Sequence, residues 1–447
     1  MEAATASAQR EPRDDGRTPL RLRDSGTIVP LASWSALILL GWLVGTILND
    51  QGITLLLDSP PLYGAWDVRL GPGSLLPIAV GGLAVWLWPR IIERASWRGV
   101  LGAAFVFALA WPVALALIEG TGELTEPLLW FTQYQQAVPF VGDPLEFIRD
   151  FNTVVNGYPA HVTAHPPLAV LVYWIVEQVV PGVWGATVLT LVSAATTPIA
   201  VLIAARALSD ESTARRAAPY LVIAPAALSI ATSADALFMA VIAWSICALL
   251  VALTGPRGRR ADVLSLLGGL GFGIGLFMSF GLILAGAIPL AVAIQKRRIR
   301  PIVFAAIGGL AVIGAFLAAG YWWLDGLGVV DEQYADSVAS TRPYAYFVWN
   351  NLAAFALGAL GPALAIALWR FRDRRLAWVV GGAFAAIAVA DISGMSKAEV
   401  ERIWLPFLPW ILLAAVALPS DRRSMRRLIG AQAVTTFVIA TYVWTIW

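Results

Sequence analysis

Residues 29–48, V-P-L-A-S-W-S-A-L-I-L-L-G-W-L-V-G-T-I-L, form an uncharged run directly after an arginine-rich N-terminal stretch. A helix crosses the hydrocarbon of a bilayer with about 20 apolar residues, which is the length of this run. Further apolar segments follow near 74–91, 98–118, 184–205, 217–232, 236–254, 262–279, 281–295, 302–323, 345–369, 376–392, 402–418 and 428–446. Lipid offers no partner to an unpaired backbone group, so spanning segments of this kind are helices. The sequence therefore predicts an all-α, polytopic membrane protein with about 13 transmembrane helices.

The composition agrees with this class. The chain has 447 residues, of which 59% are hydrophobic and 13% charged, outside the usual range of soluble globular domains. The single cysteine, Cys247, lies in an apolar segment, which excludes an intrachain disulfide and disfavours a cysteine-based metal cluster.

Positive charge is sorted between the two sides of the predicted bundle. Of the 31 Lys and Arg residues, all but five lie in the N-terminal stretch or in every second connection. The five exceptions are Arg69, Arg149, Arg342, Lys397 and Arg402. Cytoplasmic loops carry an excess of Lys and Arg, so the pattern predicts a cytoplasmic N-terminus. The inner basic clusters are typical of orientation signals, with binding of anionic lipid headgroups as the alternative, and we assign them no catalytic role.

Three outward connections, 49–73, 119–183 and 324–344, are longer and more polar than simple turns, and a shorter one covers 393–401. Within the longest, residues 144–155 and 167–180 have the apolar content of helices that lie along a membrane surface. Treating 167–180 as a span would move Arg206, Arg215 and Arg216 to the outer side, so charge indicates that it does not cross. We expect the functional site in these connections.

Carboxylates gather where the third predicted span ends. Glu119 follows the apolar run directly, in E-G-T-G-E-L-T-E, with Glu123 and Glu126 close by. An apolar boundary raises the cost of ionising a carboxylate, which is suitable for a general base. The alternative for Glu119 is an ordinary acid at the end of a helix.

The only two histidines, His161 and His165, are four residues apart in Y-P-A-H-V-T-A-H-P-P-L. Zinc ligation would need helix through this stretch, which the following Pro166 and Pro167 disfavour, and no H-E-x-x-H pattern is present. The proline pair more readily starts a helix at 167, leaving its amides and His165 facing an anion. A proline-held turn with incidental histidines is the alternative.

Lys and Arg are rare in the outward connections, and we expect those present to have anionic partners. Arg342 lies among tyrosines that include Tyr334 and Tyr344, and Lys397 and Arg402 lie in G-M-S-K-A-E-V-E-R-I-W. For the two arginines we favour a lipid phosphate, because the guanidinium group matches planar oxyanions. For Lys397 we favour an internal carboxylate such as Glu399 or Asp391, with a lipid phosphate as the alternative. Asp235, in T-S-A-D-A, is a candidate substrate ligand or a cap of the following helix.

These features together resemble the GT-C superfamily of membrane glycosyltransferases. The resemblance rests on Glu119 after a core helix, on H-P-P-L at 165–168 before a surface helix, on Asp235 at a hinge, and on a later outer loop containing Arg342. In that superfamily a catalytic acid follows the first core helix. Here two helices precede that helix and spaced glutamates replace the usual acid pair, so Asp50, Asp58, Asp67, Asp143 and Asp150 are alternatives to Glu119 as the acid.

The resemblance implies a division of the chain into a disordered cytoplasmic tail (1–28), two N-terminal transmembrane helices (29–97), a GT-C-like core (98–370) and C-terminal transmembrane helices (371–447). It also implies an inverting glycosyltransferase of the plasma membrane, with its active site on the extracytoplasmic side. The donor would be a polyprenyl-phosphate sugar and the acceptor a glycan or glycolipid, as in the arabinofuranosyl- and mannosyltransferases of cell wall biogenesis. Partners would be membrane lipids and these substrates, with no nucleic acid, and the sequence specifies no metal or other cofactor.

Each candidate residue has a role in this hypothesis. Glu119, Asp143 or Asp150 would be catalytic, and Arg342, Arg402, Lys397 and His165 would bind the donor phosphate. His161, Tyr334, Tyr344 and Asp235 would contact substrate. A transporter or flippase of a lipid-linked intermediate is the rival hypothesis, disfavoured by few mid-span charges and no internal symmetry. A non-catalytic membrane subunit is a third.

Overall fold

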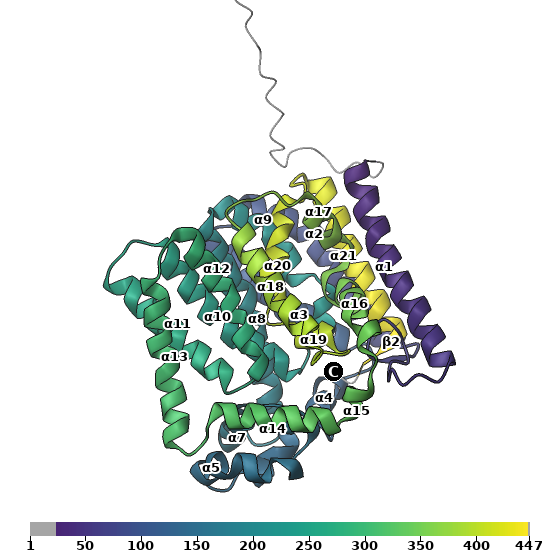
Figure 1. Ribbon diagram of the computed structural model, residues 1–447. Helices are drawn as coiled ribbons and strands as arrows, with labels where there is room; N and C mark the ends of the chain where they lie inside the picture. Colours follow the sequence, from purple (N-terminus) through teal and green to yellow (C-terminus); the bar gives the residue numbers. More distant parts are fainter. Residues whose placement is uncertain (1–23, 446–447) are drawn as a thin grey trace, which may run out of the picture.

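The computed structural model describes residues 24–445, which form an all-α protein that is 77% helical. A bundle of long helices makes up most of the molecule, and short helices lie across one end of it (Figure 1). The predicted all-α class is confirmed. The expected disordered tail falls almost entirely outside the described residues, and its last residues already belong to the first helix.

Seven helical segments are long and apolar enough to cross a membrane, as expected of a multi-pass membrane protein. They are α1 (Ser25–Asp50), η1 with α2 (Pro72–Arg94), α3 (Trp97–Ala116), α8 (Val183–Leu208), α10 (Ala234–Thr254), α13 (Arg300–Ala318) and the α16–η7–α17 unit (Tyr344–Arg370).

The prediction of about 13 spans is wrong, because six apolar segments of the sequence do not form long apolar helices. They form α9 (Glu211–Val222) with η5 (Pro225–Ser229), α11 (Arg259–Leu276), η6 (Phe280–Gly286) with α12 (Ala287–Lys296), α18 (Ala377–Ile392), the series α19 (Val400–Ile403), α20 (Leu408–Ile411) and η8 (Leu412–Ala417), and α21 (Arg422–Tyr442). Proline accounts for two of the failures. Pro225 forces Ala224 into an extended conformation after α9, and Pro406 and Pro409 interrupt 402–418. The helices α11 and α21 begin with arginines, which make their first turns too polar for a span. The helix α18 has only 16 residues, which is shorter than a span requires.

Glycine allows a close contact between α11 and α13. A Cβ atom added at Gly269 would lie 2.0 Å from the carbonyl oxygen of Ala305, and one at Gly308 would lie 2.3 Å from that of Leu266. Only hydrogen fits at these positions, so the two backbones pack directly, as small residues permit between helices in lipid.

The end layer consists of residues 117–182 together with α14 (Trp323–Asp336) and α15 (Val338–Thr341). Residues 117–182 form η2 (Gly122–Leu124), α4 (Glu126–Leu129), η3 (Tyr134–Phe140), α5 (Pro144–Val154), η4 (Val155–Gly157), α6 (Ala160–Thr163) and α7 (Leu168–Val179). Two of these, α5 and α7, confirm the helices predicted over 144–155 and 167–180. Figure 1 shows α5, α7 and α14 together at the end of the bundle where α1 finishes.

A short two-stranded sheet fixes the segment between α1 and α2. The strand β1 (Ala65–Trp66) pairs antiparallel with β2 (Val443–Trp444), which follows α21. The pairing continues beyond the strand, where the Arg69 amide donates to the carbonyl of Thr441 at 2.7 Å. This sheet holds the Arg69 side chain in place at the end of the bundle that carries the end layer.

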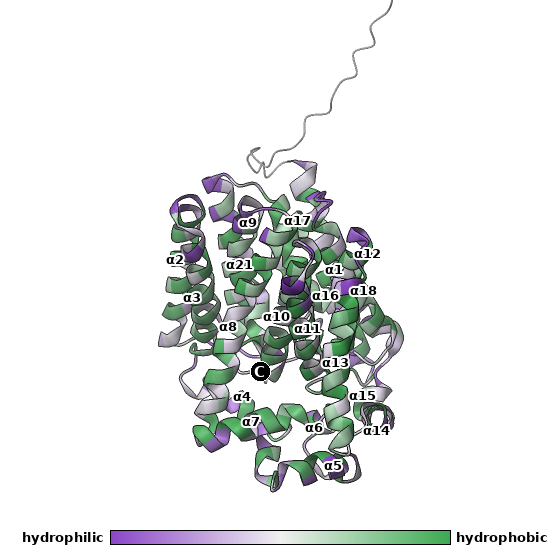
Figure 2. Ribbon diagram, turned by 90° about the vertical axis from the view of Figure 1, so that its left-hand side faces the viewer, coloured by the Kyte–Doolittle hydropathy of each residue, from purple (hydrophilic) through white to green (hydrophobic). Residues whose placement is uncertain are grey.

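Arginines at the opposite end of the bundle bind the C-terminal ends of neighbouring helices. Arg215 donates to the carbonyls of Ile92 and Ala95 at the end of α2, and Arg298 donates to those of Leu253 and Gly255 at the end of α10. Carbonyls in the last turn of a helix lack partners in their own helix and attract cations. Hydrophilic residues gather at this end in Figure 2. The basic clusters therefore also stabilise helix ends.

Candidate functional site

The first polar cluster centres on an arginine buried between the bundle and the end layer. Arg402, on the one-turn helix α19, donates to the carboxylate of Asp235 in the first turn of α10 and to that of Glu399 at 2.6 Å. Its side chain is only 8% exposed and that of Asp235 is 9% exposed. Ser233, the N-cap of α10, accepts a hydrogen bond from the Asp235 amide and fixes the start of that helix.

This arginine stays charged despite its burial. Burial by itself lowers the pKa of Arg402, but the carboxylates of Asp235 and Glu399 outweigh it and raise the pKa above its ordinary value. A buried cation is tolerated only where carboxylates compensate its lost hydration. The three residues therefore form one electrostatic unit.

Both histidines of the end layer approach this unit. The His165 ring lies edge-on to Tyr134, with 5.5 Å between ring centroids, and 6.0 Å from the ring of Phe238 on α10. Burial lowers the pKa of His165, and it lowers that of His161 to about 3, with Arg402 as a further cause. Both rings are therefore neutral at physiological pH.

The His165 ring and the start of α7 are already engaged. His165 Nδ1 lies 2.7 Å from the carbonyl oxygen of His161, which assigns the proton to Nδ1 and leaves Nε2 as an acceptor. The Leu168 amide donates to the carbonyl of Phe277. The helix does start beside Pro167, as the proline pair predicts, but His165 presents no donor to a phosphate in this tautomer. No group of three or more metal-binding side chains is present within residues 24–445.

Arg342 has spare hydrogen-bonding capacity. Its side chain is buried, and its Nη1 donates to the carbonyl of Lys397. The guanidinium carbon lies 5.7 Å from the ring centroids of both Tyr63 and Phe347. Among the described residues its Nε has no partner. A cation held by rings and a carbonyl, and by no carboxylate in the described structure, is suited to an anionic ligand.

The other candidates near Arg342 are engaged with backbone groups. Lys397 donates to the carbonyl of Ser340 at 3.2 Å and lies over the Tyr334 ring. The carboxylate partner expected for Lys397 is not found within residues 24–445. The Tyr334 hydroxyl donates to the carbonyl of Gly394, and the Tyr344 hydroxyl to that of Ile392. These tyrosines hold the loop that carries Lys397.

Tyr63 and Glu401 extend the first cluster, and neither was a sequence candidate. The Tyr63 amide donates to Glu401 Oε1 at 3.1 Å, and burial raises the pKa of Glu401 to about 7. Burial raises the pKa of Tyr63 as well, as does Glu399, while Arg342 and Arg402 lower it. Tyr63 therefore lies within electrostatic range of both arginines. The backbone of Ala398 and Glu399 is left-handed, with φ of 72° and 61°, a strained conformation that clusters at functional sites.

A second, acidic cluster surrounds Arg69. Its guanidinium donates to Glu119 at 2.5 Å and to Glu123 at 2.8 Å. Arg69, Glu123 and Glu126 line a pocket that is open to solvent, together with Trp130 and Trp444. We call it the acidic pocket. Glu126 forms no salt bridge in the part of the chain that the structure describes.

The structure separates several candidates that the sequence grouped. Glu119 contacts Arg69, and no interaction joins it to Arg342 among the described residues. Asp143 is the N-cap of α5, accepting from the amides of Leu145 and Glu146, and Asp150 is exposed on the same helix. Arg402 and Asp235, considered separately in the sequence, are brought together. The sequence marked Arg69 only as one of five outward cations. The small number of such cations was the one available sign that Arg69 binds the outer carboxylates.

Comparison with known proteins returned no match. No family model matches the chain, and no curated protein or solved structure does so either. The resemblance to GT-C glycosyltransferases therefore remains a prediction.

Proposed function

We propose that this chain is a GT-C-like membrane glycosyltransferase that moves a sugar from a polyprenyl-phosphate donor to an extracytoplasmic acceptor. The long apolar helices and the sorting of positive charge support a plasma membrane protein with a cytoplasmic N-terminus. In this orientation the end layer and both polar clusters face the extracytoplasmic side. The sequence resemblance over 98–370 supports the reaction class.

The observation that carries the proposal is the buried first cluster at the boundary between the bundle and the end layer. Buried arginines with compensating carboxylates are costly, and ionisable groups of this kind in membrane proteins mark functional sites. In our proposal Arg342 binds the donor phosphate with its free Nε and with the positive field that Lys397 adds. Arg402 holds the carboxylates of Asp235 and Glu399 in position.

The acidic pocket supplies the acceptor side and the base. Arg69 occupies the carboxylates of Glu119 and Glu123, whereas Glu126 has no cation partner in the described structure. We therefore assign the base to Glu126, ahead of Glu119. Ala231 lines the acidic pocket, and Asp235 follows four residues later, so the two Cα atoms are at most about 14 Å apart. The acidic pocket therefore lies close to the first cluster at the start of α10.

The reaction balances with these groups. The acceptor hydroxyl gives its proton to Glu126 while its oxygen forms a bond to the anomeric carbon. The bond from that carbon to the phosphate oxygen breaks, and the electron pair leaves with the lipid phosphate. Arg342 stabilises the charge that develops on this phosphate. Attack opposite the leaving group inverts the anomeric configuration.

The test is transfer from a radiolabelled polyprenyl-phosphate sugar by purified full-length protein in nanodiscs. Loss of a general base costs about 10²–10⁴-fold, so Glu126→Gln should lose at least a hundredfold. Arg342→Ala should lose a comparable factor. The matched controls are Glu332→Gln on α14 and Arg149→Ala on α5, both exposed in the same end layer, and they should keep parental activity. Full transfer by both site variants would reject the site, and no product from the parent with any such donor would favour the transporter hypothesis.

A further inference from the structure

The helices α2 and α21 pack against each other in antiparallel directions, and α2 lies at one margin of the bundle in Figure 2. A Cβ atom added at Gly81 would lie 3.3 Å from that of Ala433, and one added at Gly430 would lie 3.7 Å from a methyl group of Val85. Later residues of α2 therefore contact earlier residues of α21. The end of α2 and the start of α21 both lie at the basic end of the bundle.

Each helix carries an exposed apolar stripe beside this contact. The stripe on α2 contains Ile78, Gly82 and Trp86, and the stripe on α21 contains Val434 and Val438. In both helices the stripe lies one residue after the line of contact, which is a rotation of about 100° about the helix axis. Because the helices are antiparallel, these equal rotations bring both stripes to the same side of the pair.

Arginines continue both stripes at the basic end. On α2, Arg90 and Arg94 follow Trp86 at intervals of four residues. On α21, Arg427 and Arg423 lie about two and three turns before the exposed valines. Each stripe is therefore apolar over most of its length and cationic at its end, like one leaflet of a membrane from its acyl chains to its headgroups.

Positive charge at this end is largely uncompensated. Within residues 90–94 and 421–427, six arginines face two carboxylates, which leaves an excess of four positive charges. Glu93 forms a salt bridge with Arg422. The side chains that are exposed and make no hydrogen bond or salt bridge within residues 24–445 are those of Arg94, Arg423 and Arg427.

Other arginines at the basic end are engaged with the protein itself. Arg215 and Arg298 bind carbonyl groups at helix ends, and Arg300 forms a salt bridge with Asp262. The arginines beside α2 and α21 therefore differ from these in having guanidinium groups available to a ligand.

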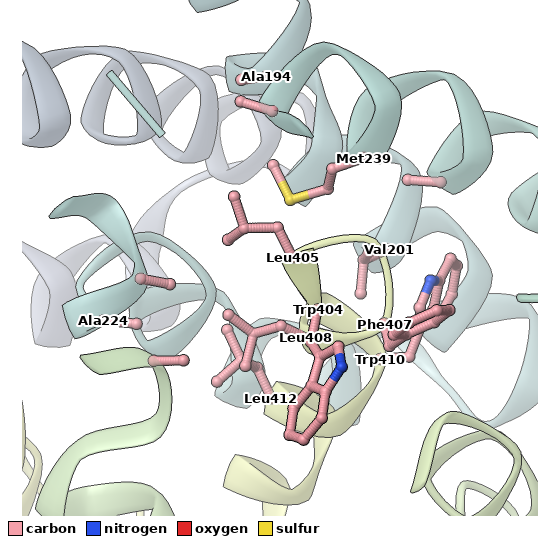
Figure 3. Packing of buried hydrophobic residues seen from close by; sticks show 14 of the residues in the cluster. Ala194, Val201, Ala224, Met239, Trp404, Leu405, Phe407, Leu408, Trp410 and Leu412 are labelled. Carbon is pink, nitrogen blue, oxygen red and sulfur yellow. The ribbon is translucent and has the colours of Figure 1, made fainter. Parts of the chain in front are cut away.

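The cavity inside the bundle is too small for a lipid. Leu405 faces Met239, and Leu408 and Leu412 extend toward Ala224 (Figure 3). The space among these side chains measures about 30 Å³, which has room for about two water molecules. A phospholipid therefore requires the outer surface of the helices.

We propose that the paired stripes of α2 and α21 bind one anionic phospholipid of the inner leaflet. Its acyl chains lie along the apolar stripes, and its phosphate contacts Arg94, Arg423 and Arg427. With the N-terminus in the cytoplasm, the basic end of the bundle meets the inner leaflet. This binding does not depend on the proposed transferase, since both polar clusters lie at the opposite end of the bundle.

The side chains suit the successive parts of such a lipid. Guanidinium groups bind phosphate oxygens through charge-assisted hydrogen bonds. Trp86 lies between the apolar and cationic parts of its stripe, the position that tryptophan favours at a membrane interface. The guanidinium of Arg90 lies over its ring, with 4.3 Å between the guanidinium carbon and the ring centroid.

Native mass spectrometry of the full-length protein in detergent tests the proposal. The protein is titrated with phosphatidylglycerol and, separately, with phosphatidylcholine that has the same acyl chains. We expect one phosphatidylglycerol to bind at least tenfold more tightly than phosphatidylcholine. Each basic residue near a membrane surface contributes a factor of about five to the affinity for anionic lipid. The triple variant Arg94→Gln, Arg423→Gln, Arg427→Gln should therefore bind phosphatidylglycerol at least tenfold more weakly than the parent.

The matched control is the triple variant Arg257→Gln, Arg259→Gln, Arg260→Gln. It removes the same charge from exposed positions at the same end of the bundle and should keep the parental affinity. All six substitutions are on exposed side chains, so both variants should keep the parental unfolding temperature. The corresponding triple variant with lysine at 94, 423 and 427 should retain most of the affinity, which separates loss of charge from loss of fold.

A competition experiment separates a lipid from a free anion. Neither inorganic phosphate nor glycerophosphoglycerol, the headgroup without its chains, should displace the bound lipid at equal concentration. Displacement by either would overturn the assignment to a phospholipid. Equal affinity for the two lipids, or an equal loss in both glutamine variants, would overturn the site.

Discussion

Arg402 donates a hydrogen bond to the carboxylate of Asp235, 167 residues earlier in the chain, and both side chains are buried. The contact joins α19 to the first turn of α10, between the bundle and the end layer. Removing one member of a buried ion pair leaves an uncompensated charge, which usually costs about 3–5 kcal/mol. The pair therefore makes the position of α19 dependent on α10.

Asp235→Asn should strongly destabilise the protein for this reason. We expect a markedly lower unfolding temperature in detergent, measured by intrinsic fluorescence. The double variant Asp235→Asn with Arg402→Met removes both members of the pair, so the loss should be smaller than the sum of the two single losses. Additive losses would show that the two side chains do not act as a pair.

Glu401 should make stability depend on pH. Burial raises its pKa to about 7 from an ordinary value near 4.5. A carboxyl whose folded pKa is raised stabilises the fold fully below the unfolded pKa, and this contribution is lost as pH rises through about 7. The difference corresponds to about 3 kcal/mol. Glu401→Gln should therefore be more stable than the parent at pH 8 and similar to it at pH 5.

The two buried histidines change stability with pH in the opposite direction to Glu401. The effect of Glu401 is therefore measured as the difference in stability between the parent and Glu401→Gln. The pKa values of the histidines are lowered on folding, so their contribution is lost as pH falls below about 6.5, where the unfolded chain binds protons. The parent and the Glu401 variant share this effect, and it cancels in their difference. A difference that does not change between pH 5 and pH 8 would contradict the assignment of the shift to Glu401.

Arg69 should matter for transfer without contacting the donor. Arg69→Gln leaves the carboxylates of Glu119 and Glu123 without their cation, and these like charges then disturb the mouth of the acidic pocket. We expect KM for the acceptor to rise about tenfold while KM for the donor stays within about twofold. The check is initial-rate kinetics with each substrate varied in turn. A rise confined to the donor KM would show that Arg69 affects binding of the donor and not of the acceptor, which would contradict this assignment.

Cysteine labelling tests the orientation of the chain in the membrane. The native Cys247 is buried, which keeps background labelling low. Val68→Cys and Val338→Cys, both exposed near the end layer, should react with a membrane-impermeant maleimide on intact cells. Arg259→Cys, at the opposite end of the bundle, should react only after permeabilisation. The reverse pattern would invert the proposed topology.

Local sequence features predicted much of the fold. Uncharged apolar runs located the long helices, and the segments around 144 and 167 became α5 and α7 as expected. Apolar content alone failed where proline interrupts a segment, as at Pro225, or where arginines open a helix, as in α21. Hydropathy measures the transfer of side chains to lipid and does not report these breaks.

The site was less accessible from sequence, because its contacts are long-range. Arg402 and Asp235 each stood out as a charge beside apolar sequence, but nothing local shows that they pair. Glu119 was rightly placed at the end of α3, yet its partner, Arg69, depends on the sheet between β1 and β2. Glu401 became notable only through burial that the fold creates.

A density map of the full-length protein with a polyprenyl phosphate bound tests directly whether Arg342 binds the donor phosphate. We expect phosphate density within about 4 Å of the Arg342 guanidinium, the range of a charge-assisted contact, at the boundary between the bundle and the end layer. Phosphate density at the basic end of the bundle, with none beside Arg342, would contradict it.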